Sequence, residues 1–214
     1  MSVGKGGIAH VTTARFSDGQ VELAEHHLHR LLHDAALCGS DAAVCRVAVQ
    51  AAQAAVVGDE GPGTMRIVVE NDSFDVKKQP LRRMLWQLSD APLALQWAPD
   101  PRQGLARQAK VADRTEYDGI PADAVFVDDG RVLEGPYAHI AFRIDGVWVT
   151  PAPGDGVLVG SMQQHLLAQP EWSAAHITVE DVERADACVM FSAHLRIAPV
   201  AKLGGRTFPR LVAM

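Results

Sequence analysis

Three groups in the second half of the chain could together carry out chemistry on an amine. Lys110 supplies a primary amine, Glu134 supplies a carboxylate just after a turn, and Gly160 precedes a stretch with helical spacing. A lysine amine forms a Schiff base with an aldehyde cofactor when burial or neighbouring cations lower its pKa. A carboxylate opposite a ring nitrogen keeps the ring protonated, and unpaired N–H groups at a helix start hold phosphate. These residues therefore outline a site for a phosphorylated aldehyde cofactor.

Each of these residues also has an ordinary structural interpretation. The chain has five lysines, and a lysine is most often a solvated surface residue. Glu134 could equally be a solvated strand end, and a glycine before a helix is common. Arg30 could bind phosphate in a bidentate geometry or form a surface ion pair. Residue types alone leave both interpretations open.

Four histidines close together raise the possibility of a metal site. His26, His27, His29 and His33 include pairs with helical spacing. No cysteine or carboxylate completes a familiar ligand set, so we predict no metal. The sequence also lacks a Gly-x-Ser-x-Gly elbow, a Walker loop and a GxGxxG motif, which gives no support to hydrolase, phosphoryl-transfer or hydride-transfer chemistry.

Composition bounds the class of protein. The chain has 214 residues, 48% of them apolar, with a formal net charge of −6 and scattered basic residues, which argues against a nucleic-acid partner. The three cysteines form no CxxC and no even set, as expected for free thiols in a reducing compartment. The N-terminus lacks an apolar signal core, and the most apolar stretch, 42–57, contains an arginine and two glutamines. We therefore expect a cytoplasmic protein with no membrane segment.

The first half of the chain predicts a small α/β lobe. Residues 10–16 have strand composition, and 17–20 form a hairpin turn signal. Helical spacing follows over 21–38 with Gly39 as a stop, and Ser40-Asp41 caps a second helix over 42–57. Strands are predicted at 64–70 and 92–97. Two prolines and a glycine in 99–104 predict a linker, so residues 1–98 form the N-terminal lobe.

Residues 105–214 predict a larger, β-rich C-terminal lobe. Short strands are expected at 124–127, 140–144, 147–150, 177–179, 187–191 and 197–203, with helices at 161–167 and 180–184. Helices packed on sheets in two lobes predict an α+β fold.

In this order, several motifs resemble those of the class IV aminotransferase family, fold type IV of the pyridoxal-phosphate enzymes. The family's His-Leu-x-Arg-Leu matches 27–31, its Gly-x-Val-x-Glu matches 130–134, its Asp-Gly-x-x-x-Thr-Pro matches 145–151, and its late Ala-Asp strand matches 185–190. The resemblance covers nearly the whole chain and implies a two-lobed fold like that of D-amino-acid aminotransferase. Residues 110–114 (Lys-Val-Ala-Asp-Arg) resemble the Lys-x-x-x-Arg of 4-amino-4-deoxychorismate lyases, and only 24 positions separate Lys110 from Glu134.

The resemblance implies a role for each matched residue. Lys110 would bond to pyridoxal 5′-phosphate and move protons, and Glu134 would pair with the pyridine nitrogen. The phosphate would be held by Arg30, Gly160 and Ser161. Arg114 would meet a substrate carboxylate or support the cofactor.

Some positions depart from the family pattern. The family's Asn five residues after the glutamate is His139, and the Thr of its phosphate cup is Met162. A later phosphate-contacting Thr aligns with Ala193, beside Ser192. On the substrate side, the family's Phe-Glu-Thr reads Val-Thr-Thr, with Thr12 in the middle. Phosphate affinity is therefore expected to be reduced.

The leading hypothesis is a pyridoxal-phosphate-dependent lyase acting by β-elimination to give an aromatic amine, such as 4-aminobenzoate, and pyruvate. One alternative is a class IV transaminase, which uses the same cofactor. Another is a cofactor-free relative acting as a binding protein, motivated by the altered phosphate cup. Resemblance also implies a homodimer that acts on a small amino-acid-type substrate.

Overall fold

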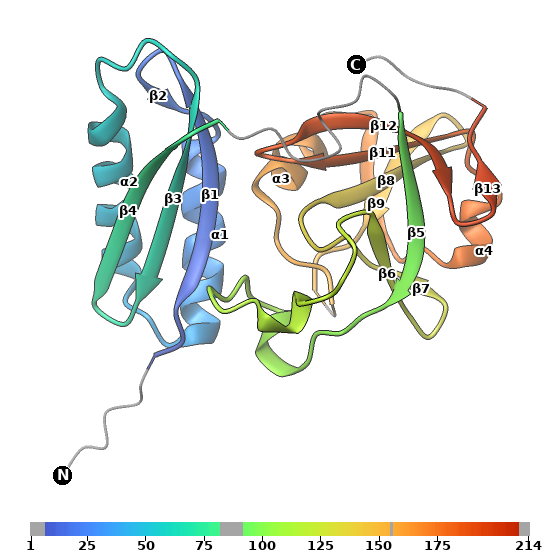
Figure 1. Cartoon of the computed structure of the whole chain (residues 1–214), viewed down its shortest axis with the longest axis horizontal. Coiled ribbons are helices and arrows are strands. Elements are labelled where there is room, and N and C mark those ends of the chain that lie inside the picture. Colours follow the sequence, from blue (N-terminus) through green and yellow to red (C-terminus); the bar gives the residue numbers. More distant parts are fainter. Residues whose placement is uncertain (1–6, 82–91, 155, 210–214) are drawn as a thin grey trace. The chain divides into compact units, whose positions relative to one another are not determined.

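The computed structural model describes residues 7–81, 92–154 and 156–209, which belong to two compact units (Figure 1). Unit 1 comprises Met1–Arg82 and Gln103–Arg114, and unit 2 comprises Arg83–Arg102 and Thr115–Met214. Both contain helices and strands, and the fold is α+β as predicted.

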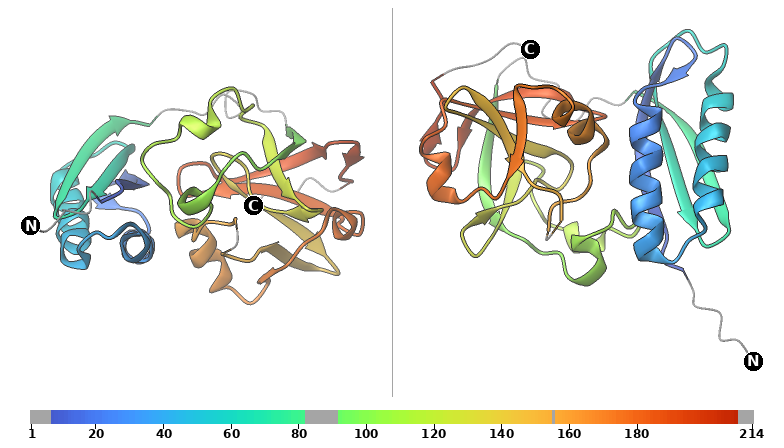
Figure 2. Two further views of the ribbon diagram at one scale, coloured as in Figure 1. Left: turned by 90° about the horizontal axis from the view of Figure 1, so that it is seen from below. Right: turned by 180° about the vertical axis from the view of Figure 1, so that it is seen from behind.

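Unit 1 is an antiparallel sheet with two helices against one face. Its strands lie in the order β2-β1-β3-β4, and Figure 2 shows both helices on the same side of the sheet. The elements are β1 (His10–Ser17), β2 (Gln20–Val21), α1 (Ala24–Cys38), α2 (Ala42–Val56), β3 (Gly63–Glu70), β4 (Ser73–Pro80) and the 3-10 helix η2 (Gly104–Arg107).

Local sequence explains where the helices of unit 1 begin and end. Gly39 ends α1 in the left-handed conformation, with a φ of 79° that favours glycine. Asp41 caps α2, because its carboxylate accepts a hydrogen bond from the Ala43 N–H at 2.8 Å. The turn between β1 and β2 also has positive φ at Asp18 and Gly19, as a two-residue hairpin requires. These boundaries agree closely with the predicted ones.

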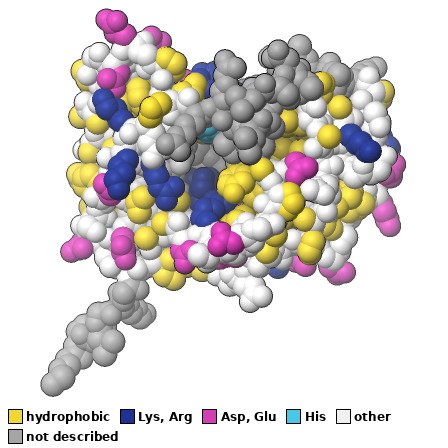
Figure 3. Space-filling view, viewed as in Figure 1, with side chains coloured by type: hydrophobic (Ala, Val, Ile, Leu, Met, Phe, Trp, Pro, Cys, Tyr) yellow, Lys and Arg dark blue, Asp and Glu magenta, His cyan; other side chains and the backbone are white. Residues whose placement is uncertain are grey.

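Alternation along β1 separates an interior face from a basic face. Ala14 and Phe16 pack with α1 and α2 in the core of unit 1. On the other face, Thr13 pairs with Arg66 of β3, which pairs with Lys77 of β4. Figure 3 shows lysine and arginine side chains gathered over this unit.

Unit 2 is built on a curled, mixed sheet of nine strands. The strand order is β10-β9-β8-β11-β12-β5-β6-β7, with β13 paired to β12. The strands are β5 (Leu93–Pro99), β6 (Ala124–Asp128), β7 (Arg131–Val132), β8 (His139–Ile144), β9 (Val147–Pro151), β10 (Trp172–Ala175), β11 (Ala187–Ser192), β12 (Arg196–Leu203) and β13 (Arg206–Thr207). The helices are the 3-10 helix η3 (Thr115–Tyr117), α3 (Ser161–Leu167) and α4 (Val179–Val182).

Period-two alternation gives this sheet two apolar faces. Ile140 and Phe142 of β8 lie in the larger core of unit 2, whereas Ala141 between them packs in a second core with Leu166 of α3. Trp148 and Trp172 stack in this second core, with ring centroids 5.6 Å apart. This second core therefore holds α3 against the sheet.

The units differ from the predicted lobes in two segments. Strand β5, predicted in the N-terminal lobe, belongs to unit 2, where it pairs in parallel with β6 and β12. Residues Gln103–Arg114, predicted partly as linker and partly as C-terminal lobe, belong to unit 1. The predicted 99–104 linker therefore contains the point at which the chain passes from unit 2 back to unit 1.

The sequence prediction missed strands β4, β10 and β13 and assigned one strand that does not form. Strand β4 was missed, because an exposed edge strand lacks the alternation that marks a half-buried one. The predicted strand at 177–179 is only a single bridge at Thr178, and Val179 already begins α4. Thr178 caps that helix in a reciprocal capping box with Asp181. No helix among the described residues is long and apolar enough to cross a membrane.

Candidate active site

A buried carboxylate, Glu134, lies just after β7 in unit 2. Its main-chain carbonyl accepts a hydrogen bond from the Phe126 N–H at 2.9 Å, which anchors it beside β6. Oε1 accepts hydrogen bonds from Nη1 of Arg102 and, at 3.4 Å, from the Leu158 N–H. Oε2 lies 3.2 Å from Nδ1 of His139. The carboxylate is thus oriented from three sides.

Arg102 connects Glu134 to two other segments of unit 2. Its Nε donates to Asp100 at 2.8 Å, its Nη2 donates to the Gly156 carbonyl, and its guanidinium lies 5.2 Å from the Phe126 ring centroid. Burial alone would lower the pKa of Arg102, but the charges of Glu134 and Asp100 raise it overall. Arg102 is therefore a permanent cation whose fork holds Glu134 in one orientation.

The start of α3 lies against His139. The His139 ring stacks on Phe191, with centroids 5.6 Å apart. Its Nε2 would be only 2.2 Å from a Cβ placed on Gly160, so glycine is what allows the ring to approach the helix start. Ser161 follows as a buried residue on the first turn. Glu134, His139, Gly160 and Ser161 are therefore gathered in one region of unit 2.

The remaining predicted cup residues of unit 2 are engaged in packing or a turn. Met162 packs against the second core. The Ser192 hydroxyl accepts a hydrogen bond from the Leu195 N–H at 2.9 Å, within the turn that contains Ala193. The Ser192 oxygen thus already has a structural role.

Lys110 is held by its main chain in unit 1. Its carbonyl accepts a hydrogen bond from the Val11 N–H at 2.9 Å, and its N–H donates to Oδ2 of Asp34 at 3.3 Å. Beside it, Val111 forms an antiparallel bridge with His10. The segment therefore runs beside β1, and these contacts fix the Cα of this half-buried lysine.

The interior between β1 and α1 is polar near the N-terminal end of β1. The Thr12 hydroxyl lies 2.7 Å from Nδ1 of His27, and both residues are buried. Burial, followed by the charges of Arg30 and Lys110, lowers the pKa of His27 to about 3. Arg30 is also buried, with its Nε 3.6 Å from Oδ2 of Asp34. Thr12, Arg30 and Lys110 thus all belong to unit 1. Half-buried Arg114 belongs to the same unit, four residues beyond the lysine.

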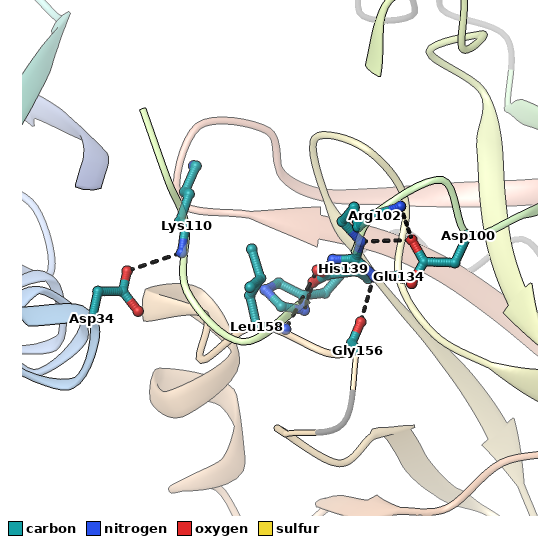
Figure 4. A network of polar contacts seen from close by, with 8 residues as sticks. All are labelled: Asp34, Asp100, Arg102, Lys110, Glu134, His139, Gly156 and Leu158. Carbon is teal, nitrogen blue, oxygen red and sulfur yellow. Dashed lines mark hydrogen bonds and ion pairs between the residues drawn. The ribbon is translucent and has the colours of Figure 1, made fainter. Parts of the chain in front are cut away.

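Figure 4 shows these two sets of polar contacts, one around Asp34 and Lys110 in unit 1 and one around Glu134 in unit 2. Three contributors were not among the predicted site residues: Asp34, Asp100 and Arg102. Asp34 follows Arg30 by four positions on a helix, a spacing that could have indicated an ion pair. Asp100 and Arg102 lie in the stretch predicted as linker, where nothing local indicated burial.

The α+β fold matches that of the fold type IV aminotransferases, a class of pyridoxal-phosphate enzymes. The chain belongs to the amino-transferase class IV family, whose model matches residues 9–203. It is accordingly an enzyme of the transaminase or lyase type with pyridoxal phosphate as its cofactor.

Solved structures show the same fold. A hypothetical aminotransferase from Mycobacterium tuberculosis, in its pyridoxal-phosphate-bound form, is 24% identical, with a TM-score of 0.76 over 95% of this chain and 84% of that one. A fold IV transaminase from Curtobacterium pusillum is 25% identical, with a TM-score of 0.76 over 95% and 80%. The 4-amino-4-deoxychorismate lyase from Pseudomonas aeruginosa is 20% identical, with a TM-score of 0.73 over 95% and 86%. No curated protein has a significantly matching sequence.

The residues present fit the cofactor. Glu134 is a buried carboxylate whose orientation is fixed by a permanent cation, which suits a partner for a protonated ring nitrogen. Gly160 lets the His139 ring approach the start of α3, and the buried Ser161 provides a hydroxyl beside it. Lys110 could provide the amine, and Arg30 is a buried cation in the same unit.

Proposed function

We propose that this chain is a pyridoxal-phosphate-dependent lyase that converts a substrate resembling 4-amino-4-deoxychorismate into an aromatic amine, such as 4-aminobenzoate, and pyruvate. The observation that carries the proposal is the 110–114 segment: Lys110 is anchored through its N–H and its carbonyl, with Arg114 four residues further on. The match to lyase structures supports the fold on which the proposal depends.

Each residue has one task in this proposal. The cofactor supplies an electron sink for the carbon that bears the substrate's amino group. Lys110 would hold the cofactor through Nζ, and its amine would take up the proton from that carbon. Glu134, oriented by Arg102, keeps the proton on the ring nitrogen. Arg30, Gly160 and Ser161 hold the phosphate, and Arg114 meets a substrate carboxylate.

Cofactor binding is tested first. We expect the purified protein to develop a visible absorption band on addition of pyridoxal phosphate, and borohydride reduction to attach the cofactor to Lys110 in a peptide map. Lys110→Ala should lose the band, whereas Lys202→Ala, which changes a lysine of β12, should retain it. Absence of the band in the wild-type protein would instead favour a cofactor-free binding protein.

Reaction type is tested next. With 4-amino-4-deoxychorismate, a lyase releases pyruvate and 4-aminobenzoate in equal amounts without a keto-acid acceptor. The second candidate is a class IV transaminase, which the 25% identity to the Curtobacterium transaminase favours. A transaminase would instead require a keto acid and form the corresponding amino acid, so a strict acceptor requirement would overturn the lyase proposal.

We also propose that the enzyme acts as a homodimer in the cytoplasm on a small amino-acid-type substrate. The family resemblance supports this. Light scattering with the cofactor bound tests the oligomeric state, and a monomer of about 23 kDa would overturn it.

A further inference from the structure

Asp34 is a buried carboxylate on the last turns of α1 that contacts a cation and the main chain of Lys110. Oδ2 lies 3.6 Å from Nε of Arg30 and accepts the Lys110 N–H at 3.3 Å. Oδ1 lies 3.1 Å from Nδ1 of His33. The side chain is 1% exposed, so water contributes little to stabilising its charge.

The hydrogen bond from the Lys110 N–H to Asp34 takes the place of a main-chain hydrogen bond that a regular strand pair would make. Val111 bridges His10, and the Val11 N–H donates to the Lys110 carbonyl. In a regular antiparallel pair, the Lys110 N–H would in turn donate to the Val11 carbonyl. Here it turns to Asp34 instead, so the carboxylate determines how the backbone is oriented at the lysine.

The charge of Asp34 also acts on Arg30. The two residues are four positions apart on α1, and both are buried. Two of the neighbouring histidines, His10 and His27, add little positive charge, because burial lowers the pKa of each. An anion beside Arg30 offsets the attraction of its guanidinium for a second anion such as phosphate.

We propose that Asp34 is a positioning residue with two effects: it holds the main chain of Lys110, and it limits how strongly Arg30 binds the phosphate of the cofactor. This inference rests on the proposed function, which assigns the amine to Lys110 and the phosphate to Arg30. It implies an enzyme whose preference for the phosphorylated cofactor is restrained by one residue outside the cofactor-binding set.

Two substitutions separate the effects. Asp34→Asn removes the charge but keeps an oxygen that can accept the Lys110 N–H. Asp34→Ala removes both. Glu25→Gln, in the first turn of the same helix, is the control for a lost carboxylate elsewhere on α1.

Affinities for pyridoxal phosphate and for unphosphorylated pyridoxal should be measured by absorbance for each variant. The ratio of the two Kd values isolates the phosphate contribution from general effects on folding. We expect Asp34→Asn to shift this ratio about tenfold in favour of the phosphorylated form, as for removing a nearby like charge. An unchanged ratio, or a shift in the opposite direction, would overturn the effect on Arg30.

The Kd for unphosphorylated pyridoxal, taken by itself, tests the effect on Lys110. We expect Asp34→Ala to bind pyridoxal several-fold more weakly than Asp34→Asn and to be trapped more slowly by borohydride, since only the alanine variant loses the acceptor. Equal behaviour of the two variants would show that Asp34 does not position the lysine.

A measurement that does not need the Lys110 amine separates this inference from the proposed function. In the Lys110→Ala background, inorganic phosphate should raise the unfolding temperature more when Asp34 is also changed to asparagine. This result would uphold the effect on Arg30 even if the wild-type protein formed no band with pyridoxal phosphate. No difference between the two proteins would count against it.

Discussion

Arg102 donates a hydrogen bond from Nη1 to Oε1 of Glu134 within the interior of unit 2. The two residues are 32 positions apart, and the same guanidinium also holds Asp100 and the Gly156 carbonyl. One side chain thus connects the segment after β5, the segment after β7 and the loop before α3. Arg102 therefore helps to orient Glu134, together with the Leu158 N–H and the His139 ring.

Replacing Arg102 is expected to destabilise unit 2 strongly. Arg102→Met leaves the carboxylates of Glu134 and Asp100 buried without their cation, and breaking a buried ion pair in this way costs about 3–5 kcal/mol. Arg102→Lys should be only partly better, since an ammonium cannot reproduce the planar fork. Urea unfolding followed by circular dichroism measures the loss.

The matched control is Arg184→Met, which breaks an ion pair with Asp145 between largely exposed side chains. Solvent screening makes such pairs weak, so the unfolding midpoint should stay close to that of the wild type. Equal losses of stability for the two arginine variants would show that burial of the Arg102 network contributes nothing to the free energy of unfolding.

His27 should make the protein sensitive to acid. Its pKa is lowered to about 3 in the folded chain, chiefly by burial, from an ordinary value of 6.5. As pH falls below 6.5, the unfolded chain binds a proton that the folded chain does not. The wild type should therefore lose up to about 1.4 kcal/mol of stability per pH unit from this group down to pH 3, and nothing from it above 6.5.

This loss is measured by comparing urea unfolding of the wild type with that of His27→Asn between pH 7 and pH 4. The advantage of the wild type over the variant should shrink steadily over this range, because asparagine does not titrate. Changing the exposed His165 to asparagine controls for the loss of a histidine elsewhere. A difference between wild type and His27→Asn that stays constant with pH would contradict the prediction.

The helix boundaries could be predicted from the sequence because their causes are local. Gly39 and Asp41 act on the helices that they adjoin, and the helix predicted at 161–167 has those bounds in the structure. Strand β4 could not be recognised, because an edge strand exposed along nearly its whole length shows no burial pattern.

The residues of the candidate site likewise fall into those with a local sequence signal and those without one. Lys110 and Glu134 belong to motifs that the sequence itself presents. The residues that hold them do not, because Asp34 reaches Lys110 across 76 positions and Arg102 reaches Gly156 across 54. Only the sheets bring such residues together, and no local pattern records which distant partner each will meet.

The three cysteines are expected to be unreactive in the folded protein. Burial, followed by the charge of a nearby aspartate, raises the pKa of both Cys38 and Cys45 to about 11, and burial also raises the pKa of Cys188 well above its ordinary value. Since the thiolate is the reactive form, a disulfide reagent at pH 8 should react slowly with the native protein. In denaturant, all three thiols should be titrated at once. Rapid reaction of one thiol before unfolding would show that it is accessible and ionised.

Gly160 should be intolerant of any side chain as long as His139 keeps its position. A Cβ at residue 160 would lie 2.2 Å from Nε2 and 2.7 Å from Cδ2 of His139, whose ring is held between Phe191 and Glu134. Gly160→Ala should therefore cost about 1–3 kcal/mol, as for overpacking an interior. Because φ at Gly160 is −87°, the cost arises from the contact with the ring and not from the backbone.

A double-mutant cycle tests this explanation. In His139→Ala the ring is absent, so adding Gly160→Ala should cost little, and the two changes should be clearly non-additive in urea unfolding. His139→Asn, which restores the residue type of the family at this position, should also relieve part of the clash because its side chain is shorter. If Gly160→Ala were equally costly with and without the histidine ring, the close approach of His139 to the start of α3 would not be the reason for glycine there.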